Sequence, residues 1–271
     1  MNVAPLPLLA MCLSLLAGAS AADAQRPVSF GERPNRDIVV PRFGDDDIAR
    51  ALTTLETRLA EAAPGAAERT YVEFTRYLQT GLLTGAQQAK VLAHLDGLER
   101  TRPSDAALLV RPREILAKFI IGRTAPEIVG TDLDGREFRL TDSRGKVVVV
   151  MFGGEWCGIC KTEYPYLRLL DELYENWPFE IVGVNSDASE KVAREASKER
   201  GLDYRVWWDG RGGRNTEGPI ARAWQIVGWP TTYVIDADGV IRFVDLRQDD
   251  LVRGVRQLMT ELSRTLEKGT R

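Results

Sequence analysis

The sequence predicts an α/β protein in which a mixed sheet covered by helices is preceded by a small helical region. Two observations lead to this fold class. Apolar residues recur at helical spacing from about residue 45 to 121, whereas short β-branched runs alternate with helical segments after Gly122. The last two short runs flank Asp238-Gly239, a strong hairpin signal. Strands that alternate with helices and end in a hairpin are typical of a mixed sheet.

Composition narrows the classes of function. With 271 residues, of which 44% are apolar and 28% are charged, the chain has the composition of a folded globular protein. Its formal net charge of -3 gives no overall positive electrostatic potential, so nucleic acid is not an expected partner. The single histidine, His94, excludes metal sites that need two histidines.

The first 24 residues have the pattern of an export signal. Residues 3–22 carry no charged side chain, Leu6 to Ala17 is strongly apolar, and Ala22-Asp23-Ala24 provides a small-x-small cleavage site. We therefore expect an exported protein, in the periplasm or another extracytoplasmic compartment. An uncleaved segment that anchors the chain in the membrane, or lipidation of Cys12, are the alternatives.

Two cysteines remain if the chain is cleaved after Ala24, and they are Cys157 and Cys160. Disulfides persist in oxidising compartments, but a bond that closes so small a loop adds little stability. The pair therefore serves chemistry or metal binding. Zinc needs two further ligands, and His94 lies in the helical region, so redox chemistry is the favoured interpretation.

Residues 25–44 are rich in proline, arginine and glycine and predict a flexible lead-in. Residues 45–121 predict four helices, whose apolar faces are Ile48/Leu52/Leu55/Leu59, Tyr71/Phe74/Leu78, Val91/Leu95/Leu98 and Ile115/Leu116/Phe119/Ile120. Thr84 and Gln87 form a capping box for the third helix, and Pro112 suits the first turn of the fourth. This helical region has no residue that suggests chemistry. It could hold a partner, a substrate or a second copy of itself.

Residues 122–268 predict the α/β domain. Its elements, in order, are a hairpin at 127–140 turned at Asp134-Gly135, a buried strand at 147–152, a helix at 158–174, a strand at 179–184, a helix at 189–200, a strand at 204–208, a loop at 210–218, a short helix at 219–225, a hairpin of strands 232–235 and 240–244, and a helix at 249–266. Pro165 should kink the helix at 158–174.

Cys157-Gly158-Ile159-Cys160 directly follows a buried strand and opens a helix, which is the context of a redox CxxC motif. Free N–H groups and the positive end of the helix dipole favour the thiolate of Cys157 and lower its pKa. Cys160, one turn further along, is placed to attack Cys157 and release a bound partner.

Several motifs together resemble the TlpA-like branch of the thioredoxin superfamily, with its redoxin (AhpC/TSA-like) domain. The resemblance covers about residues 122–246 and rests on the strand at 147–152, Trp156-Cys157-Gly158-Ile159-Cys160, Glu163, Pro165, Gly228-Trp229-Pro230-Thr231-Thr232 and the turn at 236–239. It implies a thioredoxin-like fold, with Cys157 as nucleophile and Cys160 as resolving cysteine. It also implies that Pro230 is cis, faces the disulfide and pairs its backbone with a substrate strand.

The resemblance also implies roles for the neighbouring residues. Trp156, Trp229 and Thr231 would contact the substrate. Glu163 would exchange a proton with Cys160, with an exposed surface glutamate as the alternative. Thioredoxin itself has a buried aspartate where this chain has Met151, which leaves Glu163 as the candidate for that role.

The expected function is that of an exported thiol-disulfide oxidoreductase that acts on protein thiols and disulfides, with the Cys157–Cys160 disulfide as its redox group and no cofactor or metal. If the domain reduces its substrates, a membrane electron donor must recharge it; the direction of electron flow stays open. A peroxiredoxin-like peroxidase is one alternative, although Val150 and Gly154 stand where such a site would need proline and threonine. A non-catalytic thioredoxin-fold binding module is the other.

Overall fold

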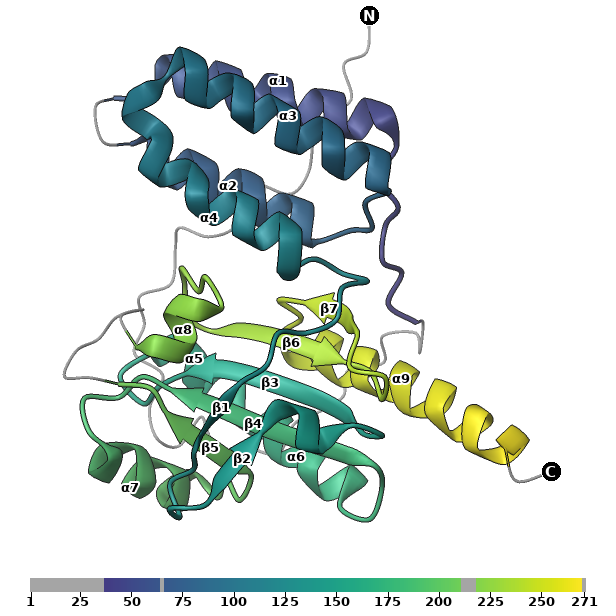
Figure 1. Cartoon of the computed structure of the whole chain (residues 1–271). Helices are drawn as coiled ribbons and strands as arrows, with labels where there is room; N and C mark the ends of the chain where they lie inside the picture. The colour runs from purple at the N-terminus through teal and green to yellow at the C-terminus, as the bar shows by residue number, and fades with distance from the viewer. Residues whose placement is uncertain (1–36, 64–65, 211–217, 270–271) are drawn as a thin grey trace, which may run out of the picture.

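The computed structural model describes residues 37–63, 66–210 and 218–269, and it stacks a layer of helices on an α/β domain (Figure 1). The helical region comprises α1 (Asp45–Glu61), α2 (Ala67–Gln79), α3 (Gly85–Thr101), the 3-10 turn η2 (Pro103–Asp105) and α4 (Ala106–Lys118). Its own apolar core joins the predicted faces of all four helices, including Ile48, Leu78 and Leu95. The helical region predicted from sequence periodicity is therefore confirmed.

Helix ends follow local chemistry in part. The capping box at α3 is confirmed, because the Thr84 hydroxyl accepts from the Gln87 N–H at 3.2 Å and the Gln87 amide oxygen accepts from the Thr84 N–H at 2.9 Å. The prediction for Pro112 is wrong: α4 begins at Ala106 and holds Pro112 in its interior. Pro103, at the start of η2, provides the proline-led first turn instead.

The α/β domain contains a five-stranded sheet in the order β5-β4-β3-β6-β7. Its elements are β1 (Val129–Thr131), β2 (Glu137–Arg139), the 3-10 turn η3 (Leu140–Ser143), β3 (Val147–Gly153), α5 (Gly158–Lys161), α6 (Tyr164–Tyr174), β4 (Phe179–Asn185), α7 (Glu190–Arg200), β5 (Arg205–Trp208), α8 (Pro219–Ala223), β6 (Thr231–Ile235), β7 (Ile241–Val244) and α9 (Gln248–Gly269). Strands β3, β4 and β5 run parallel, and β6 and β7 form the antiparallel end. This is the predicted mixed thioredoxin-like sheet.

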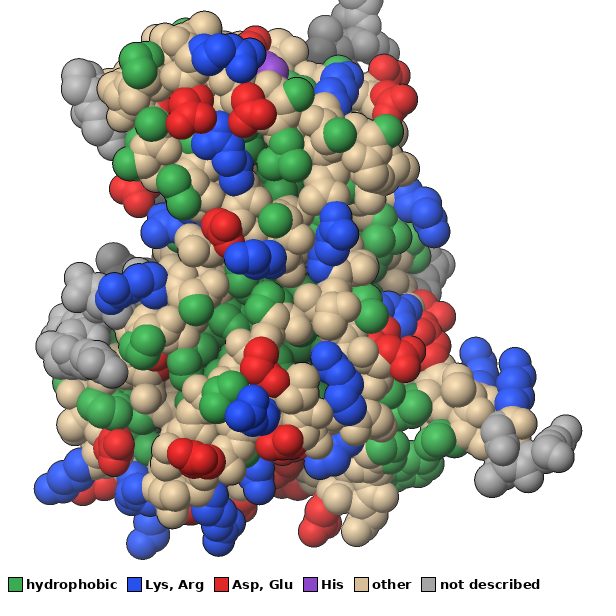
Figure 2. Space-filling model, in the orientation of Figure 1, with side chains coloured by type: hydrophobic (Ala, Val, Ile, Leu, Met, Phe, Trp, Pro, Cys, Tyr) green, Lys and Arg blue, Asp and Glu red, His purple; other side chains and the backbone are tan. Residues whose placement is uncertain are grey.

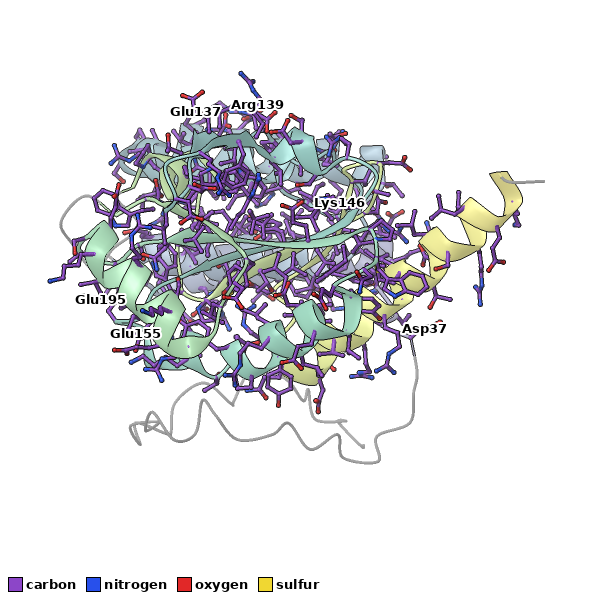
Figure 3. All side chains as sticks on the ribbon, turned by 90° about the horizontal axis from the view of Figure 1, so that it is seen from below. Asp37, Glu137, Arg139, Lys146, Glu155 and Glu195 are labelled. Atoms are coloured by element: carbon purple, nitrogen blue, oxygen red, sulfur yellow. A yellow bond between two sulfur atoms is a disulfide. The ribbon has the colours of Figure 1, made fainter. Side chains whose placement is uncertain are left out.

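Each face of the sheet has its own apolar core. One core packs Val149 and Met151 of β3 against α6 and α9. The other packs Val150 and Phe152 against α8, the β1–β2 hairpin and the end of α4. Figure 3 shows Glu137 and Arg139 of β2 on the side of the sheet away from α6 and α9. Because the end of α4 is part of the second core, the helical region helps to cover that face of the sheet.

One predicted helix differs from the structure, and the described part of the lead-in makes contacts with both regions. The single kinked helix predicted for 158–174 is two helices, because Pro165 lies in the first turn of α6 and the chain breaks at Thr162 and Glu163. Of the lead-in predicted to be flexible, residues 37–44 are described, and most of them are exposed, but two contacts anchor this part. The Ile38 N–H donates to the Gln257 side chain of α9 at 3.0 Å, and Phe43 is buried in the core of the helical region.

The exposed surface seen in Figure 2 intersperses acidic and basic side chains over both layers, in keeping with the small net charge. Within the described ranges, no helix is long and apolar enough to cross a bilayer. The predicted export signal at residues 1–24 and most of the lead-in lie outside the described residues, as does the loop at 211–217.

A buried polar cluster supports the helical region. Asp105 is 6% exposed and accepts from the Tyr71 hydroxyl at 3.0 Å and from Nε of Arg102 at 2.7 Å. Burial by itself raises the pKa of Asp105, but these hydrogen bonds outweigh it and hold the pKa below its usual value. Burial and the bond to Asp105 also raise the pKa of Tyr71 to about 12. The ionised carboxylate is therefore the form that stabilises the fold.

We expect Asp105→Asn to lower the free energy of unfolding at pH 7 by about 1 to 3 kcal/mol, because the buried partners lose a charged acceptor. Since the folded pKa of Asp105 is depressed, its contribution is complete above the unfolded pKa of about 4 and is lost as pH falls through the folded value. Urea unfolding of both proteins between pH 7 and pH 3 measures this. A difference that stays constant down to the acid end would contradict the assignment.

Candidate active site

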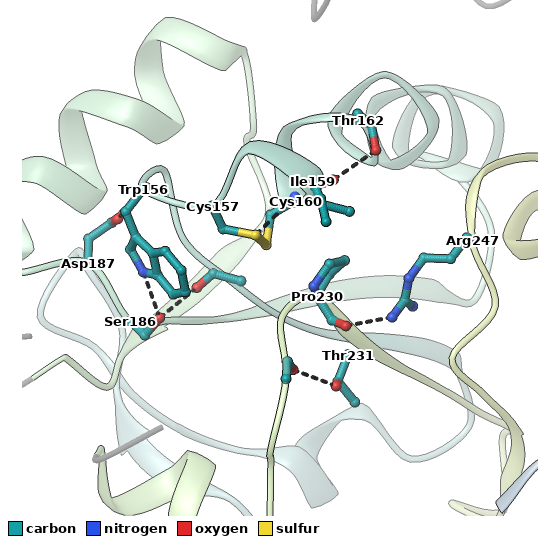
Figure 4. Close-up of a disulfide and its surroundings, with 12 residues drawn as sticks. Trp156, Cys157, Ile159, Cys160, Thr162, Ser186, Asp187, Pro230, Thr231 and Arg247 are labelled. Carbon is teal, nitrogen blue, oxygen red and sulfur yellow. Dashed lines mark hydrogen bonds between the residues drawn. A yellow bond between two sulfur atoms is a disulfide. The ribbon is translucent and has the colours of Figure 1, made fainter. Parts of the chain in front are cut away.

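The two cysteines lie where the central strand β3 turns into α5. Cys157 is the N-cap of α5, and its Sγ accepts a hydrogen bond from the Cys160 N–H at 3.1 Å. The two residues form a disulfide with their Cα atoms 5.2 Å apart (Figure 4). Cys157 is 7% exposed and Cys160 is fully buried. The pair therefore has an outer sulfur near the surface and an inner one behind it, and an N–H group is already directed at the outer sulfur.

Glu163 occupies the break between α5 and α6, three residues after Cys160, and is 1% exposed. The alternative of an exposed surface glutamate is therefore wrong. Its Oε2 accepts from the Gln248 N–H at 2.8 Å. Burial raises the pKa of Glu163, while this N–H and the charge of Arg247 limit the rise. Met151 is also buried and offers no carboxylate. Glu163, whose main-chain N–H donates to the Cys160 carbonyl at 3.1 Å, therefore stays the candidate acid.

Trp156 and Trp229 form an aromatic rim beside the disulfide. Their rings meet edge to face, with centroids 6.1 Å apart, and Trp156 is 37% exposed. The Trp156 indole N–H donates to the Ser186 hydroxyl at 3.1 Å, and its main-chain N–H donates to Asp187 at 3.3 Å. Sequence reasoning missed Ser186 and Asp187. The signal available was a polar run directly after β4, whose carboxyl end lies beside that of β3.

The segment Gly228–Thr231, here called the proline loop, faces the disulfide (Figure 4). The Trp229–Pro230 peptide bond is cis. The Thr231 hydroxyl does not face outward but donates to the Gly228 carbonyl at 2.8 Å and is buried within the loop. Arg247, which sequence reasoning also missed, donates from Nη2 to the Pro230 carbonyl.

These contacts change which backbone groups are available to a partner. Pro230 has no N–H, and its carbonyl already accepts from Arg247, so its own backbone offers a substrate strand no donor and one remaining acceptor position. Among the described residues, no hydrogen bond engages the main-chain N–H or carbonyl of Trp229. The main-chain N–H and carbonyl of Trp229, the residue before the proline, are therefore available to a partner.

Glu155, next to the rim, joins two cations. It accepts from Nζ of Lys161 at 2.7 Å and from Nη2 of Arg200 at 2.6 Å. Figure 3 shows Glu155 on the same side of the molecule as Glu195 of α7. Burial alone would raise the pKa of Glu155, but the bonds from Arg200 and Lys161 outweigh it and lower the pKa. This network fixes α5 against α7.

The positions that would carry a peroxide-binding proline and threonine do not provide such a site. Val150 is fully buried inside β3, and Gly154 has no side chain. Within the described ranges, no group of three histidine, cysteine, aspartate or glutamate residues could hold a metal ion.

Known proteins resemble the chain over this domain. A model of the AhpC/TSA family matches residues 121–244. The thiol-disulfide oxidoreductase ResA of Geobacillus thermodenitrificans is 34% identical over 122 residues, which cover 45% of this chain and 67% of the relative. ResA of Geobacillus kaustophilus is 30% identical over 141 residues, covering 51% of this chain and 78% of the relative.

Among solved structures, the thioredoxin domain of a thiol-disulfide oxidoreductase from Bacteroides vulgatus is 30% identical, with a TM-score of 0.47, and covers 52% of this chain and 99% of that one. The family match begins at residue 121, so α1 to α4 lie outside it. The relatives and the disulfide at the start of α5 support a thiol-disulfide oxidoreductase over both alternatives, the peroxidase and the non-catalytic module. The chain carries an AhpC/TSA redoxin domain and belongs to the ResA-like thiol-disulfide oxidoreductases, with Cys157 and Cys160 as its redox pair.

Proposed function

We propose that this oxidoreductase is exported and exchanges disulfides with protein substrates, which it holds against the proline loop. The observation that carries the proposal is the asymmetry of the redox pair. Cys157 lies near the surface between Trp156 and the proline loop, whereas Cys160 is fully buried behind it. A partner therefore reaches one sulfur of the pair, and the other can complete the exchange from inside.

In the reducing direction, the Cys157 thiolate attacks a substrate disulfide and forms a mixed disulfide, and one substrate thiolate leaves. Cys160 then loses its proton and attacks the Sγ of Cys157. The second substrate thiolate leaves, so the substrate gains two electrons and the enzyme becomes the disulfide. The N–H of Cys160, 3.1 Å from the Cys157 Sγ, stabilises that sulfur both as a nucleophile and as a leaving group.

Glu163 takes the proton of Cys160 in this scheme. A buried carboxylate with a raised pKa is a stronger base than an exposed one and is suited to exchange a proton near neutral pH. The Gln248 N–H binds one carboxylate oxygen and so fixes the orientation of the group.

The substrate platform consists of the Trp156 and Trp229 rings and the free main-chain groups of Trp229. A substrate segment that pairs with these groups as an added strand would place its sulfur at Cys157. Pro230 and Thr231 act from within the loop, because Arg247 and Gly228 bind their polar groups.

The location and the electron source belong to the same proposal. The apolar segment at residues 1–24 supports export. Protein disulfides persist in extracytoplasmic compartments, so such an enzyme finds its substrates there. A reducing enzyme there must be recharged by a membrane-borne dithiol donor.

We assign residues 45–121 to the helical region and 122–268 to the thioredoxin-like domain.

We expect Cys160→Ser to trap substrates as stable mixed disulfides with Cys157, because the resolving thiol is gone. Proteins linked to Cys157 in cells are identified by mass spectrometry after alkylation and non-reducing separation. Cys157→Ser/Cys160→Ser is the matched control and should trap nothing. A folded, exported Cys160→Ser variant without covalent partners would rule out exchange with protein substrates.

We expect Glu163→Gln to prolong the mixed disulfide by roughly a hundredfold at neutral pH, the low end of what general acid–base catalysis contributes. In the wild type the rate of the resolving step should increase as pH rises through the raised pKa of Glu163, and the variant should lose this pH dependence. Rapid quenching and mass spectrometry between pH 4 and pH 8 measure it.

The stability of the same variant is a control. A raised folded pKa means that the contribution of Glu163 to stability is present at acid pH and lost as pH rises through that value. Glu163→Gln should therefore unfold no more easily than the wild type at pH 7. Equal resolving rates in both proteins would remove Glu163 from the proton step.

We expect Trp156→Ala to raise the half-saturating concentration of a peptide disulfide roughly tenfold, about 1.4 kcal/mol, because the aromatic rim loses one ring. Trp177→Ala is the matched control: Trp177 is 53% exposed and precedes β4 at the opposite end of the sheet. Stopped-flow single turnovers of the reduced enzymes measure both. Equal effects of the two substitutions would contradict the platform.

A further inference from the structure

The turn between β7 and α9, residues 245–247, and the first residue of α9 hold two parts of the active site at once. Arg247 binds the proline loop through the Pro230 carbonyl, and its Nη1 donates to the Thr232 hydroxyl at 2.8 Å. The next residue, Gln248, opens α9 and donates its N–H to the buried Glu163 carboxylate. One short turn therefore connects the substrate side of the redox pair to its proton acceptor.

The backbone of this turn is held in an unfavourable conformation. Asp245 and Gln248 have φ values of 59° and 49°, in the left-handed region that residues other than glycine seldom adopt. Such residues persist where surrounding contacts impose them, and they cluster at functional sites. Here Asp245 donates its N–H to the Thr232 carbonyl at 2.8 Å. Contacts on both sides of Arg247 therefore determine where its guanidinium group lies.

The contacts extend from this turn into the helical region. Asp245 accepts from Arg247 at 3.0 Å through Oδ1, and its Oδ2 accepts from Nη2 of Arg76, in α2, at 3.0 Å. One turn further along α2, the Gln79 amide donates to the Phe119 carbonyl at 2.9 Å and approaches the Tyr233 hydroxyl at 3.4 Å. The same face of α2 therefore touches β6 and the turn after β7.

Arg76 also covers the proline loop directly. A Cβ atom added at Gly228 would lie 3.3 Å from Nη1 of Arg76, so the guanidinium group closes the open side of this glycine. Gly228 immediately precedes Trp229, whose main-chain groups are free. A single arginine of the helical region therefore contacts both the loop and the carboxylate that holds the loop's anchor.

We propose that Arg76 is a positioning residue for the proline loop, acting through Asp245 and Arg247, and that the helical region thereby sets the affinity for disulfides carried on peptides. The inference rests on the proposed docking of substrate at Trp229. It gives residues 45–121 a role in substrate binding, although they lie outside the redoxin domain, which begins near residue 121.

Two substrates with the same chromophore separate positioning from general damage. One is the symmetrical disulfide of nitrothiobenzoate; the other is the mixed disulfide of nitrothiobenzoate with a short alanine-rich peptide that contains one cysteine. The reduced enzyme is oxidised to the Cys157–Cys160 disulfide while the substrate disulfide is reduced to two thiols. At least one of these thiols is coloured nitrothiobenzoate. Single turnovers give a half-saturating concentration and a limiting rate for each substrate.

We expect Arg76→Ala to raise the half-saturating concentration of the peptide disulfide roughly fivefold, the range of a partly exposed ion pair, and to leave the symmetrical disulfide unchanged. Arg76→Lys keeps the charge beside Asp245 and should restore most of the affinity. Arg76→Ala and Asp245→Asn should be non-additive, since they break one connection. Arg69→Ala, which removes an exposed arginine from the same helix, is the matched control.

Hydrogen exchange tests the same role without any substrate. Deuterium uptake at residues 226–233 should rise in Arg76→Ala and not in Arg69→Ala, because the loop loses a contact at Gly228. The proposal is overturned if Arg76→Ala matches Arg69→Ala in both measurements, or if it slows both disulfides equally. If Trp156→Ala leaves peptide affinity intact while uptake still rises in Arg76→Ala, the docking proposal fails and the positioning of the loop stands.

Discussion

The active site depends on the burial of β3 at the centre of the sheet. Every residue of this strand is buried, with β4 hydrogen-bonded on one side and β6 on the other. Its carboxyl end can therefore move little, and the turn that leads to Cys157 starts from a fixed point. Because β6 begins at Thr231, the same pairing brings the proline loop to the disulfide. The fold thus brings the redox pair and the proline loop to one edge of the sheet.

Chemistry at this edge follows from unequal burial. Cys157 keeps a small exposed fraction of 7%, whereas Cys160 and Glu163 are almost completely buried. An interior of low polarity raises the pKa of a carboxyl group and strengthens the few hydrogen bonds that it makes. The turn after β7 and the first residue of α9 supply the bonds to Pro230 and to Glu163, so the proline loop and the buried carboxylate share one support.

Much of this architecture could be predicted from local patterns. The apolar run of β3, the CxxC motif after it and the hairpin at Asp238-Gly239 specify their elements through neighbours in the chain, and the structure has all three. Predictions failed where a local preference met a tertiary contact. Pro112 is buried inside α4 instead of opening it, and Pro165 separates α5 from α6 where one kinked helix was predicted.

The sequence alone determined the redox chemistry, since two cysteines at this spacing after a buried strand have few other uses. It also located Pro230 and the candidate acid Glu163. Only the tertiary structure decided that Glu163 is buried, that the Pro230 carbonyl is occupied, and that Arg76 reaches the loop through Asp245. Those contacts join residues 17 to 169 positions apart, and no periodicity or spacing in a chain records which distant side chains will meet.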